Sequence, residues 1–320
     1  MNSKPYSVGI DIGGTNSVFG IVDRNGKVIA KGSIKTRGYK DFNDYLDHLY
    51  EGLSKLIKEN DAEGKICGIG IGAPGANYHT GEIVNAANLN WGENLPIAWL
   101  VSEKFGGLPV TVTNDANAAT MGEMVYGAAR GMKDFVMITL GTGVGSGIVS
   151  NGKIIYGHDG LAGELGHVIV EKRGRDCGCG RKGCLETYCS STGVVRTAKE
   201  FLKGDEPSKL RELDPDQITS KDVYDAAIAG DKMAKDIFDY TGKMLGEALA
   251  DFTAFSSPEA FILFGGLMRS GDLLMEPLKK SFDEALLFIY KDKPKILVSE
   301  LNEDDGAVLG ASALGWESEG

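Results

Sequence analysis

The stretch YSVGIDIGGTNSVFGIVDRNGKVIAKGSI (residues 6–34) decides the fold, because it alternates strand-forming runs with turns that contain glycine. Two apolar runs flank Gly13-Gly14-Thr15, which predicts two strands joined by a tight turn. Asn25-Gly26 then predicts a hairpin turn, since both residues tolerate positive φ angles. The chain therefore opens with an antiparallel three-stranded meander and not with a βαβ unit.

The same order of features returns in FVMITLGTGVGSGIVSNGKIIY (residues 135–156), with a glycine turn at 141–143 and a second Asn-Gly pair. We interpret this repeat as an internal duplication that gives two α/β lobes of similar topology. A long helix is expected from Asp115 to about residue 129. The predicted first lobe is 1–114 plus a C-terminal helix within 305–320, and the larger second lobe is 115–304.

Composition excludes several classes of function. The chain has 320 residues, a net charge of −11 and 42% hydrophobic residues, and lysine and arginine form no cluster. These features argue against a nucleic-acid or membrane-surface role. Neither a signal-peptide core nor a run of about 18 apolar residues is present, so we expect a cytoplasmic protein.

Four of the five cysteines lie within thirteen residues. A histidine upstream of three of them completes a set with the spacing of a closed, structural zinc site. The predicted ligands are His167, Cys177, Cys179 and Cys184, which makes 167–184 a zinc loop. Unrelated reduced thiols are the alternative. Cys67 is expected in the core, and Cys189 is an extra cysteine without a clear place among the ligands.

Two glycine turns are candidate phosphate sites, because glycine lets backbone N–H groups approach phosphate oxygens closely. The first comprises Asp11, Gly13, Gly14, Thr15 and Asn16, and the second comprises Gly141, Thr142 and Gly143. Gly265-Gly266 is a third point of close approach, which could pass under an adenine ring. Asp11 ends a buried strand, where a bound Mg²⁺ would offset the cost of a buried carboxylate. None of the three matches a P-loop, and simple chain reversal is the alternative.

Carboxylates supply the candidate catalytic groups. Asn114-Asp115 lies where a strand ends and a helix begins, so it is either a helix cap or an amide beside a general base for phosphoryl transfer. Glu164 and Glu186 flank the zinc loop, where a bound metal would fix both for contact with hydroxyl groups. The alternative is that both are solvated charges.

These residues together resemble the ROK family of sugar kinases and sugar-responsive repressors. The resemblance covers essentially the whole chain and is most specific in Cys177-Gly178-Cys179-Gly180-x2-Gly183-Cys184-Leu185-Glu186 together with His167. It implies a two-lobed, actin-like fold of the hexokinase type, which is ribonuclease H-like. The implied sugar-binding residues are Gly75, Asn88, Asn114, Asp115, Glu164, His167 and Glu186, with Asp115 as the catalytic base. Asn16 departs from the lysine that many members carry.

The resemblance implies transfer of phosphate from ATP to the 6-hydroxyl of a hexose, with glucose as the first candidate. N-acetylhexosamine kinase and fructokinase are alternatives within the family, and a non-catalytic sugar-binding regulator is the alternative from another class. Asp115 and both phosphate turns are present, which favours a kinase. The expected cofactors are ATP, Mg²⁺ and structural Zn²⁺, and a homodimer is implied by the resemblance alone.

Overall fold

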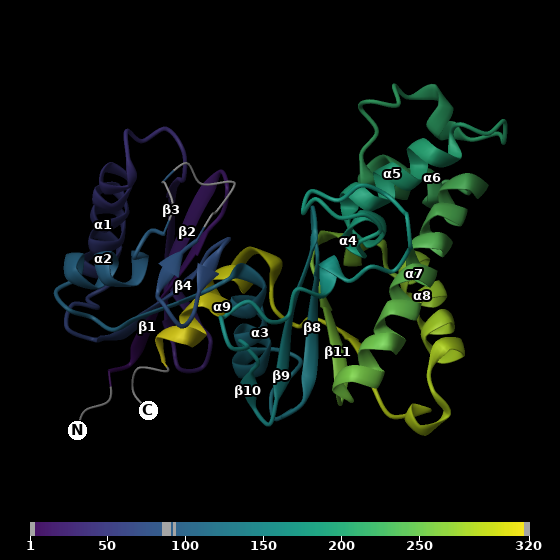
Figure 1. Cartoon of the computed structure of the whole chain (residues 1–320). Coiled ribbons are helices and arrows are strands. Elements are labelled where there is room, and N and C mark those ends of the chain that lie inside the picture. Colours follow the sequence, from purple (N-terminus) through teal and green to yellow (C-terminus); the bar gives the residue numbers. More distant parts are fainter. Residues whose placement is uncertain (1–3, 85–90, 92–93, 317–320) are drawn as a thin grey trace. The chain divides into compact units, whose positions relative to one another are not determined.

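The computed structural model of this chain describes residues 4–84, 91 and 94–316. The chain divides into two compact units, coloured along the sequence in Figure 1. Unit 1 comprises 1–132, 148–163 and 299–320, and unit 2 comprises 133–147 and 164–298. Among the described residues, none of the helices combines the length and the apolar character needed to cross a bilayer.

Unit 1 is built on a five-stranded sheet in the order β3-β2-β1-β4-β7. Its strands are β1 (Tyr6–Ile12), β2 (Asn16–Asp23), β3 (Val28–Lys35), β4 (Ile66–Gly72) and β7 (Val110–Thr113). Its helices are α1 (Phe42–Glu59), α2 (Ile97–Lys104), α3 (Asp115–Tyr126) and α9 (Glu303–Gly315). A small hairpin, β5 (Ala76–Asn77) and β6 (Glu82–Ile83), follows β4.

Alternation along β1 distributes the helices of unit 1 over two faces of its sheet. Val8 and Ile10 are fully buried in the core that α1 and α2 complete, whereas Gly9 between them faces α9. This is the two-residue period of a strand that is buried on both faces. Figure 1 shows α1 and α2 on one side of the sheet and α9 with α3 on the other.

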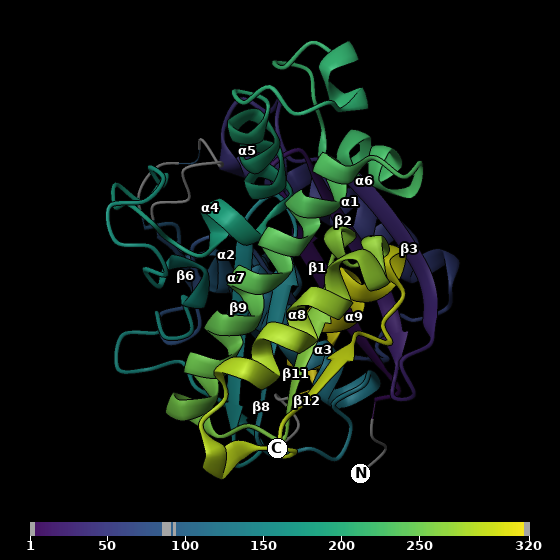
Figure 2. The ribbon, with the colours of Figure 1, turned by 90° about the vertical axis from the view of Figure 1, so that its right-hand side faces the viewer.

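Unit 2 contains most of the second sheet, whose order is β10-β9-β8-β11-β12. Its strands are β8 (Phe135–Leu140), β9 (Val144–Ser150), β10 (Lys153–Ile154), β11 (Ala260–Phe264) and β12 (Lys295–Val298), and the division between the units passes through β9. Its helices are α4 (Glu186–Cys189), α5 (Ser191–Phe201), α6 (Ser220–Ile228), α7 (Lys232–Ser256) and α8 (Asp272–Ala285). In Figure 2, α7 and α8 cover one face of β8 and β11.

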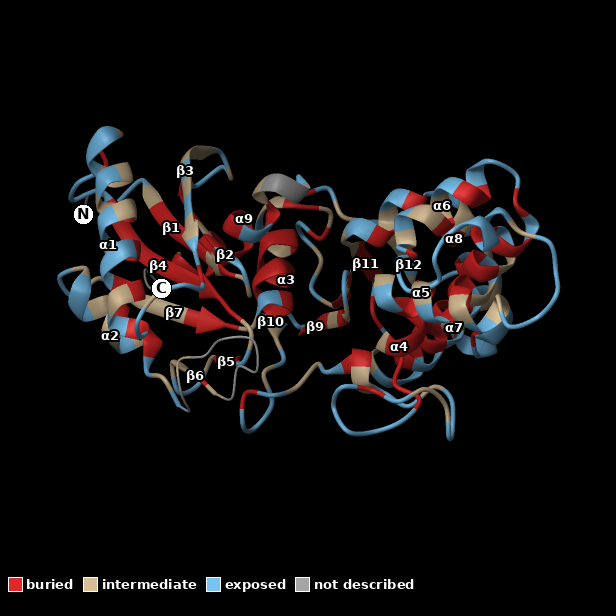
Figure 3. Cartoon of the chain, turned by 90° about the horizontal axis from the view of Figure 1, so that it is seen from above, coloured by how far each residue is buried: buried red, intermediate tan, exposed pale blue. Residues whose placement is uncertain are grey.

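The two sheets confirm the predicted internal duplication. Each sheet begins with a three-stranded meander, β3-β2-β1 in the first sheet and β10-β9-β8 in the second. Two further strands continue each sheet beside the first strand of the meander, β4 and β7 in the first sheet and β11 and β12 in the second. In both sheets the added strands run parallel, β4 to β1 and β11 to β8. Figure 3 shows that buried residues concentrate on the strands and on the helix faces that cover them.

The expected lobe boundary at Asn114 differs from the division of the structure, because α3 groups with unit 1. Helix α3 packs closely on α9: a Cβ built on Gly310 would lie 2.5 Å from the carbonyl oxygen of Ala118. Helix α3 also ends at Tyr126 instead of about residue 129. The backbone leaves the helical region at Gly127, with φ −109° and ψ −151°, and the Glu123 carboxylate accepts the next N–H, that of Ala128, at 2.7 Å.

We expect Gly70→Ala to destabilise the protein, because a Cβ at Gly70 would lie 1.8 Å from the carbonyl oxygen of Ala311 in α9. Backbone must move to admit it, so the free energy of unfolding should fall by roughly 1–3 kcal/mol or more. Urea unfolding would measure the change. Gly204→Ala is the matched control, since its nearest neighbour lies 3.5 Å away; equal effects from both variants would contradict the packing argument.

Candidate active site

The first glycine turn joins β1 to β2 and is held by its own backbone. The Gly13 N–H donates to the carbonyl of Asn16 at 3.1 Å, and the carbonyl of Thr15 accepts the Thr36 N–H at 2.9 Å. Thr15 and Asn16 are exposed, which leaves their polar groups accessible to a ligand. The turn is therefore held in one conformation by its own backbone before any ligand binds.

Asp11 and Asp115 belong to the same unit and lie at the same edge of its sheet. A Cβ built on Gly72, the last residue of β4, would lie 3.8 Å from Asp11 Oδ1 and 3.9 Å from Asp115 Cα. Burial, and secondarily the charge of Asp115, raise the pKa of Asp11 from 3.8 to about 6. A cation bound at this edge would offset both effects, so the donor chemistry fits Mg²⁺.

Asn114 and Asp115 both contribute to the start of α3. Asn114 is the N-cap, and its Oδ1 accepts the Asn117 N–H at 2.7 Å. Asp115 Oδ1 accepts the Ala116 N–H at 2.9 Å, and the residue is exposed at the positive end of the helix dipole. Capping by Asn114 leaves its amide N–H groups available to a ligand, so the capping and functional interpretations are compatible.

The loop after β4 runs beside the strand end that carries Asn114. The Ala73 N–H donates to the carbonyl of Thr113 at 3.0 Å. Gly75 is exposed two residues later and adopts a φ of 70°, which favours glycine. Asn88, the other predicted sugar ligand of this region, lies outside the described residues.

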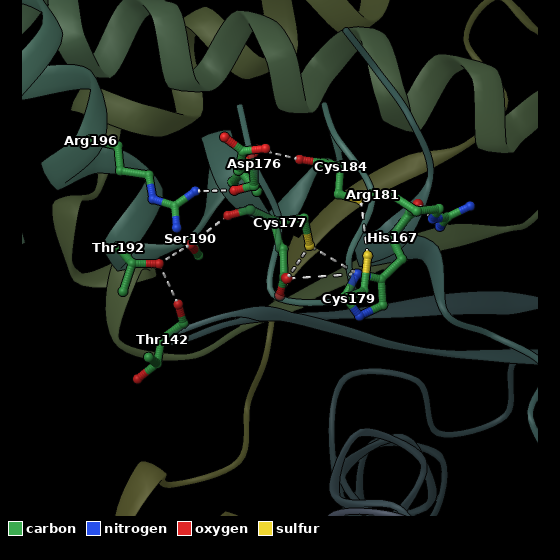
Figure 4. Close-up of polar contacts among 12 residues, drawn as sticks. Thr142, His167, Asp176, Cys177, Cys179, Arg181, Cys184, Ser190, Thr192 and Arg196 are labelled. Carbon is green, nitrogen blue, oxygen red and sulfur yellow. Dashed lines mark hydrogen bonds and ion pairs between the residues drawn. The ribbon is translucent and has the colours of Figure 1, made fainter. Parts of the chain in front are cut away.

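The second glycine turn and the third lie at one cavity of about 520 Å³ within unit 2. Gly141, Thr142 and Gly266 line it, while Gly143 and Gly265 are not among the lining residues. Helix α5 begins against the same turn, since Ser191 N and Oγ each lie 2.9 Å from the carbonyl oxygen of Gly141. Thr192 Oγ1 donates to the carbonyl of Thr142 at 2.8 Å (Figure 4).

The four predicted metal ligands converge. One ligand atom each from His167, Cys177, Cys179 and Cys184 lies within 4.8 Å of all the others (Figure 4). Tetrahedral Zn–S bonds of about 2.3 Å would place two sulfurs about 3.8 Å apart. The observed separation is 3.6 Å between Cys179 Sγ and Cys184 Sγ, and His167 Nδ1 lies 3.6 Å from Cys177 Sγ. The set could therefore hold Zn²⁺.

Of the two flanking glutamates, the structure brings Glu186 into contact with this cluster. Glu186 Oε1 accepts from Cys177 Sγ at 3.0 Å and lies 3.6 Å from His167 Nδ1. A Cβ built on Gly143 would lie 2.8 Å from Glu186 Oε2, so the glycine leaves room for this carboxylate beside the turn. Glu164 is exposed, and its carbonyl accepts the His167 N–H at 3.0 Å.

The sequence model of the ROK family matches residues 7–317. The chain belongs to the ROK family. A glucokinase of Halalkalibacterium halodurans is 37% identical, over 98% of this chain and 95% of the relative.

Solved ROK structures share the fold along nearly the whole chain. A ROK family glucokinase from Streptomyces griseus, determined with glucose and AMPPNP, is 32% identical with a TM-score of 0.79, over 98% of this chain and 99% of that one. A ROK family transcriptional regulator, a homologue of the E. coli MLC protein, is 27% identical with a TM-score of 0.86, over 99% and 79%. The two-lobed ROK fold expected from the sequence is thereby confirmed.

Several candidate residues escaped the motif analysis of this ROK chain. Lys35 pairs in register with Asn16, and its Nζ donates to Asn16 Oδ1 at 3.1 Å. The register of the predicted hairpin could have identified Lys35. This residue brings an ammonium group beside Asn16, the position at which many members of the family carry lysine. Tyr224, Phe238 and Arg269 line the cavity of unit 2. They come from scattered helices, so no local motif indicates them.

We expect Asp11→Asn to stabilise the metal-free protein at pH 7 by up to about 3 kcal/mol, the free-energy cost of holding this carboxylate ionised. The folded pKa of about 6 exceeds 3.8, so the folded state binds more protons between these values. The penalty is therefore complete above pH 6 and disappears toward pH 4. Urea unfolding at pH 7 and at pH 4, with chelator present, measures it; a difference that does not change with pH would contradict the assignment.

Purified protein should contain about one zinc per chain, and Cys179→Ser should lower both the zinc content and the melting temperature. A structural site contributes its binding free energy to folding, so losing one ligand weakens both. Metal analysis and thermal unfolding measure the two effects. Cys67→Ser is the control for zinc content, because Cys67 is buried in unit 1 outside the cluster, so this variant should keep its zinc. Wild-type protein without zinc would refute the site.

Proposed function

We propose that the protein is an ATP-dependent hexose kinase that converts glucose to glucose 6-phosphate. The observation that carries this proposal is the full-length likeness to a glucokinase whose structure contains glucose and AMPPNP. The chain also retains an exposed Asp115 at the start of α3, beside the half-buried Asp11. The product would feed the breakdown of carbohydrate through reactions that use a sugar phosphate.

In this proposal Asp115 is the general base. Its carboxylate accepts the proton of the 6-hydroxyl while that oxygen forms a bond to the γ-phosphorus of ATP. The bond between the γ-phosphorus and the bridging oxygen breaks, and ADP leaves with the electron pair. Asn114 supports this role, because its cap hydrogen bond fixes the helix start that presents Asp115.

Asp11 would hold Mg²⁺, which supplies positive charge to the phosphates when it is bound. Gly14 would present its backbone N–H to phosphate oxygens and Gly13 would let the phosphate approach closely, with Thr15 and Asn16 as additional donors. In unit 2, the cavity lined by Thr142, Tyr224 and Phe238 has the aromatic and polar character expected of a nucleotide site.

Glu164, His167 and Glu186 are the proposed sugar ligands of unit 2, together with Gly75, Asn88 and Asn114 of unit 1. Carboxylates accept hydrogen bonds from sugar hydroxyls, and Glu186 is only 23% exposed, which preorganises it for that task. Structural Zn²⁺ on the Cys177 cluster would fix the loop between Glu164 and Glu186. A homodimer is part of the proposal on family resemblance alone, and a cytoplasmic location is part of it on the sequence features given above.

A sugar-binding regulator without catalysis is the second candidate function. The likeness to the transcriptional regulator, at a TM-score of 0.86, favours it. Kinases of N-acetylhexosamines or fructose share the same chemistry and differ in the pocket that receives the sugar. A panel of these sugars with ATP, assayed by coupled ADP release, separates the candidates. ADP release at the same rate with and without sugar would contradict all of the kinase assignments, and no ADP release with any sugar would favour the regulator.

We expect Asp115→Asn to lower kcat by roughly 10²–10⁴-fold, because the amide cannot accept the hydroxyl proton. The KM for glucose should change little, since the amide keeps the size of the carboxylate. ADP release in the presence of glucose measures both constants. Asp272→Asn is the matched control, because Asp272 is also an exposed aspartate at the first position of a helix; near wild-type turnover in Asp115→Asn would disprove the base.

A further inference from the structure

Arg175 lies two residues before the first cysteine of the metal cluster, and its side chain is only 9% exposed. A guanidinium carries five N–H donors, and a buried arginine must satisfy them. All five are satisfied here. Nε donates to Glu200 Oε1 at 2.9 Å, Nη1 donates to the carbonyls of Thr187 at 2.7 Å and Gly193 at 3.2 Å, and Nη2 donates to Thr197 Oγ1 at 2.8 Å and Glu200 Oε2 at 2.7 Å.

The loop around Arg175 also encloses a tyrosine of α4. The Arg175 guanidinium lies 4.4 Å from the centroid of the Tyr188 ring. The backbone N–H of Arg175 donates to the hydroxyl oxygen of Tyr188 at 2.9 Å. Gly174 is required here, because a Cβ would lie 2.1 Å from that hydroxyl. The Arg175 carbonyl accepts the Gly183 N–H at 2.8 Å, which ties the same residue to the far side of the metal loop.

These contacts matter because α4 cannot hold itself in place. It is a single turn of four residues, and its N-cap Leu185 makes no side-chain cap. One helical turn does not repay its nucleation cost without tertiary contacts. The Arg175 side chain supplies one such tertiary contact, and this contact does not involve the metal ligands. Its guanidinium donates to the carbonyl of Thr187, the residue directly after Glu186.

Glu186 is therefore held from both sides along the chain. Cys184, two residues before it, belongs to the metal cluster. Thr187, directly after it, is bound by the Arg175 guanidinium, which is itself anchored on α5 through Thr197 and Glu200. A metal bound to the cluster and the Arg175 guanidinium would fix different atoms of the same short segment.

We propose that Arg175 is a positioning residue, which orients the Glu186 carboxylate toward the sugar through α4 and does so without acting on the metal. The inference rests on the proposed function, because it takes Glu186 as a sugar ligand. Lysine cannot replace this residue, since its three donors radiate from one nitrogen and cannot reach the five acceptors of a planar fork.

The test measures KM for glucose, KM for ATP, kcat and zinc content for the wild type, Arg175→Met and Arg175→Lys. Both variants should raise KM for glucose roughly 10- to 100-fold, the loss expected when a charged hydrogen bond to the ligand is misplaced. KM for ATP and the zinc content should stay near wild type. A residue that only stabilised the fold would not separate the two KM values in this way.

Arg196→Met is the matched control. Arg196 lies on α5 and touches the same loop once, where Nη1 donates to the carbonyl of Asp176 at 2.7 Å (Figure 4). It should leave both KM values unchanged. Glu200→Gln weakens the anchor of Arg175 at a half-exposed position, so it keeps the core intact and should raise KM for glucose about 3- to 10-fold.

Each outcome decides the inference. If Arg175→Met folds and keeps the wild-type KM for glucose, the inference is wrong and the kinase assignment stands. The same holds if Arg175→Met loses its zinc together with its affinity for glucose. If Arg175→Met does not fold, an unchanged KM for glucose in Glu200→Gln overturns the inference. Wild-type protein that neither binds glucose in calorimetry nor phosphorylates it overturns the proposed function, and this inference with it.

Discussion

The close packing of α9 against β1 and β4 is the constraint on which unit 1 depends. Glycines at the contact let helix and strand backbones approach to a distance that any Cβ would block, as at Gly9 and Gly70. Helix α3 then packs on α9 in the same manner, through Gly310. Because β1 ends near Asp11 and α3 begins at Asp115, this packing sets the separation of the two carboxylates.

Electrostatics at this edge of the sheet follows from that packing. Asp11 is placed where burial and the charge of Asp115 disfavour its ionised form, which raises its pKa to about 6. Proteins keep such costly carboxylates where a ligand compensates them. The cost at Asp11 is therefore consistent with a cation and phosphates at this edge, and Lys35, which contacts Asn16, adds positive charge beside the turn.

The two repeats use one scaffold for different tasks. The first turn follows a strand that ends in a carboxylate, whereas the second turn, at Gly141-Thr142-Gly143, is neutral and receives the start of α5. The long insertion between β9 and β11 adds the metal cluster and its short helix α4. Without that insertion, nothing in the second repeat would place a carboxylate such as Glu186 beside the turn.

The sequence alone determined the α/β class, the duplication and the membership of the cluster of His167 and three cysteines, because these depend on local patterns: apolar runs, glycine turns and cysteine spacing. It also identified Asn114-Asp115 correctly as a helix start. Tertiary structure decided what depends on contacts between distant segments. It placed α3 with unit 1, ended α3 at Tyr126, and assembled the cavity around Tyr224 and Arg269 from separate helices. It alone gave Arg175 its five acceptors, because no periodicity relates that residue to Thr187 and Glu200.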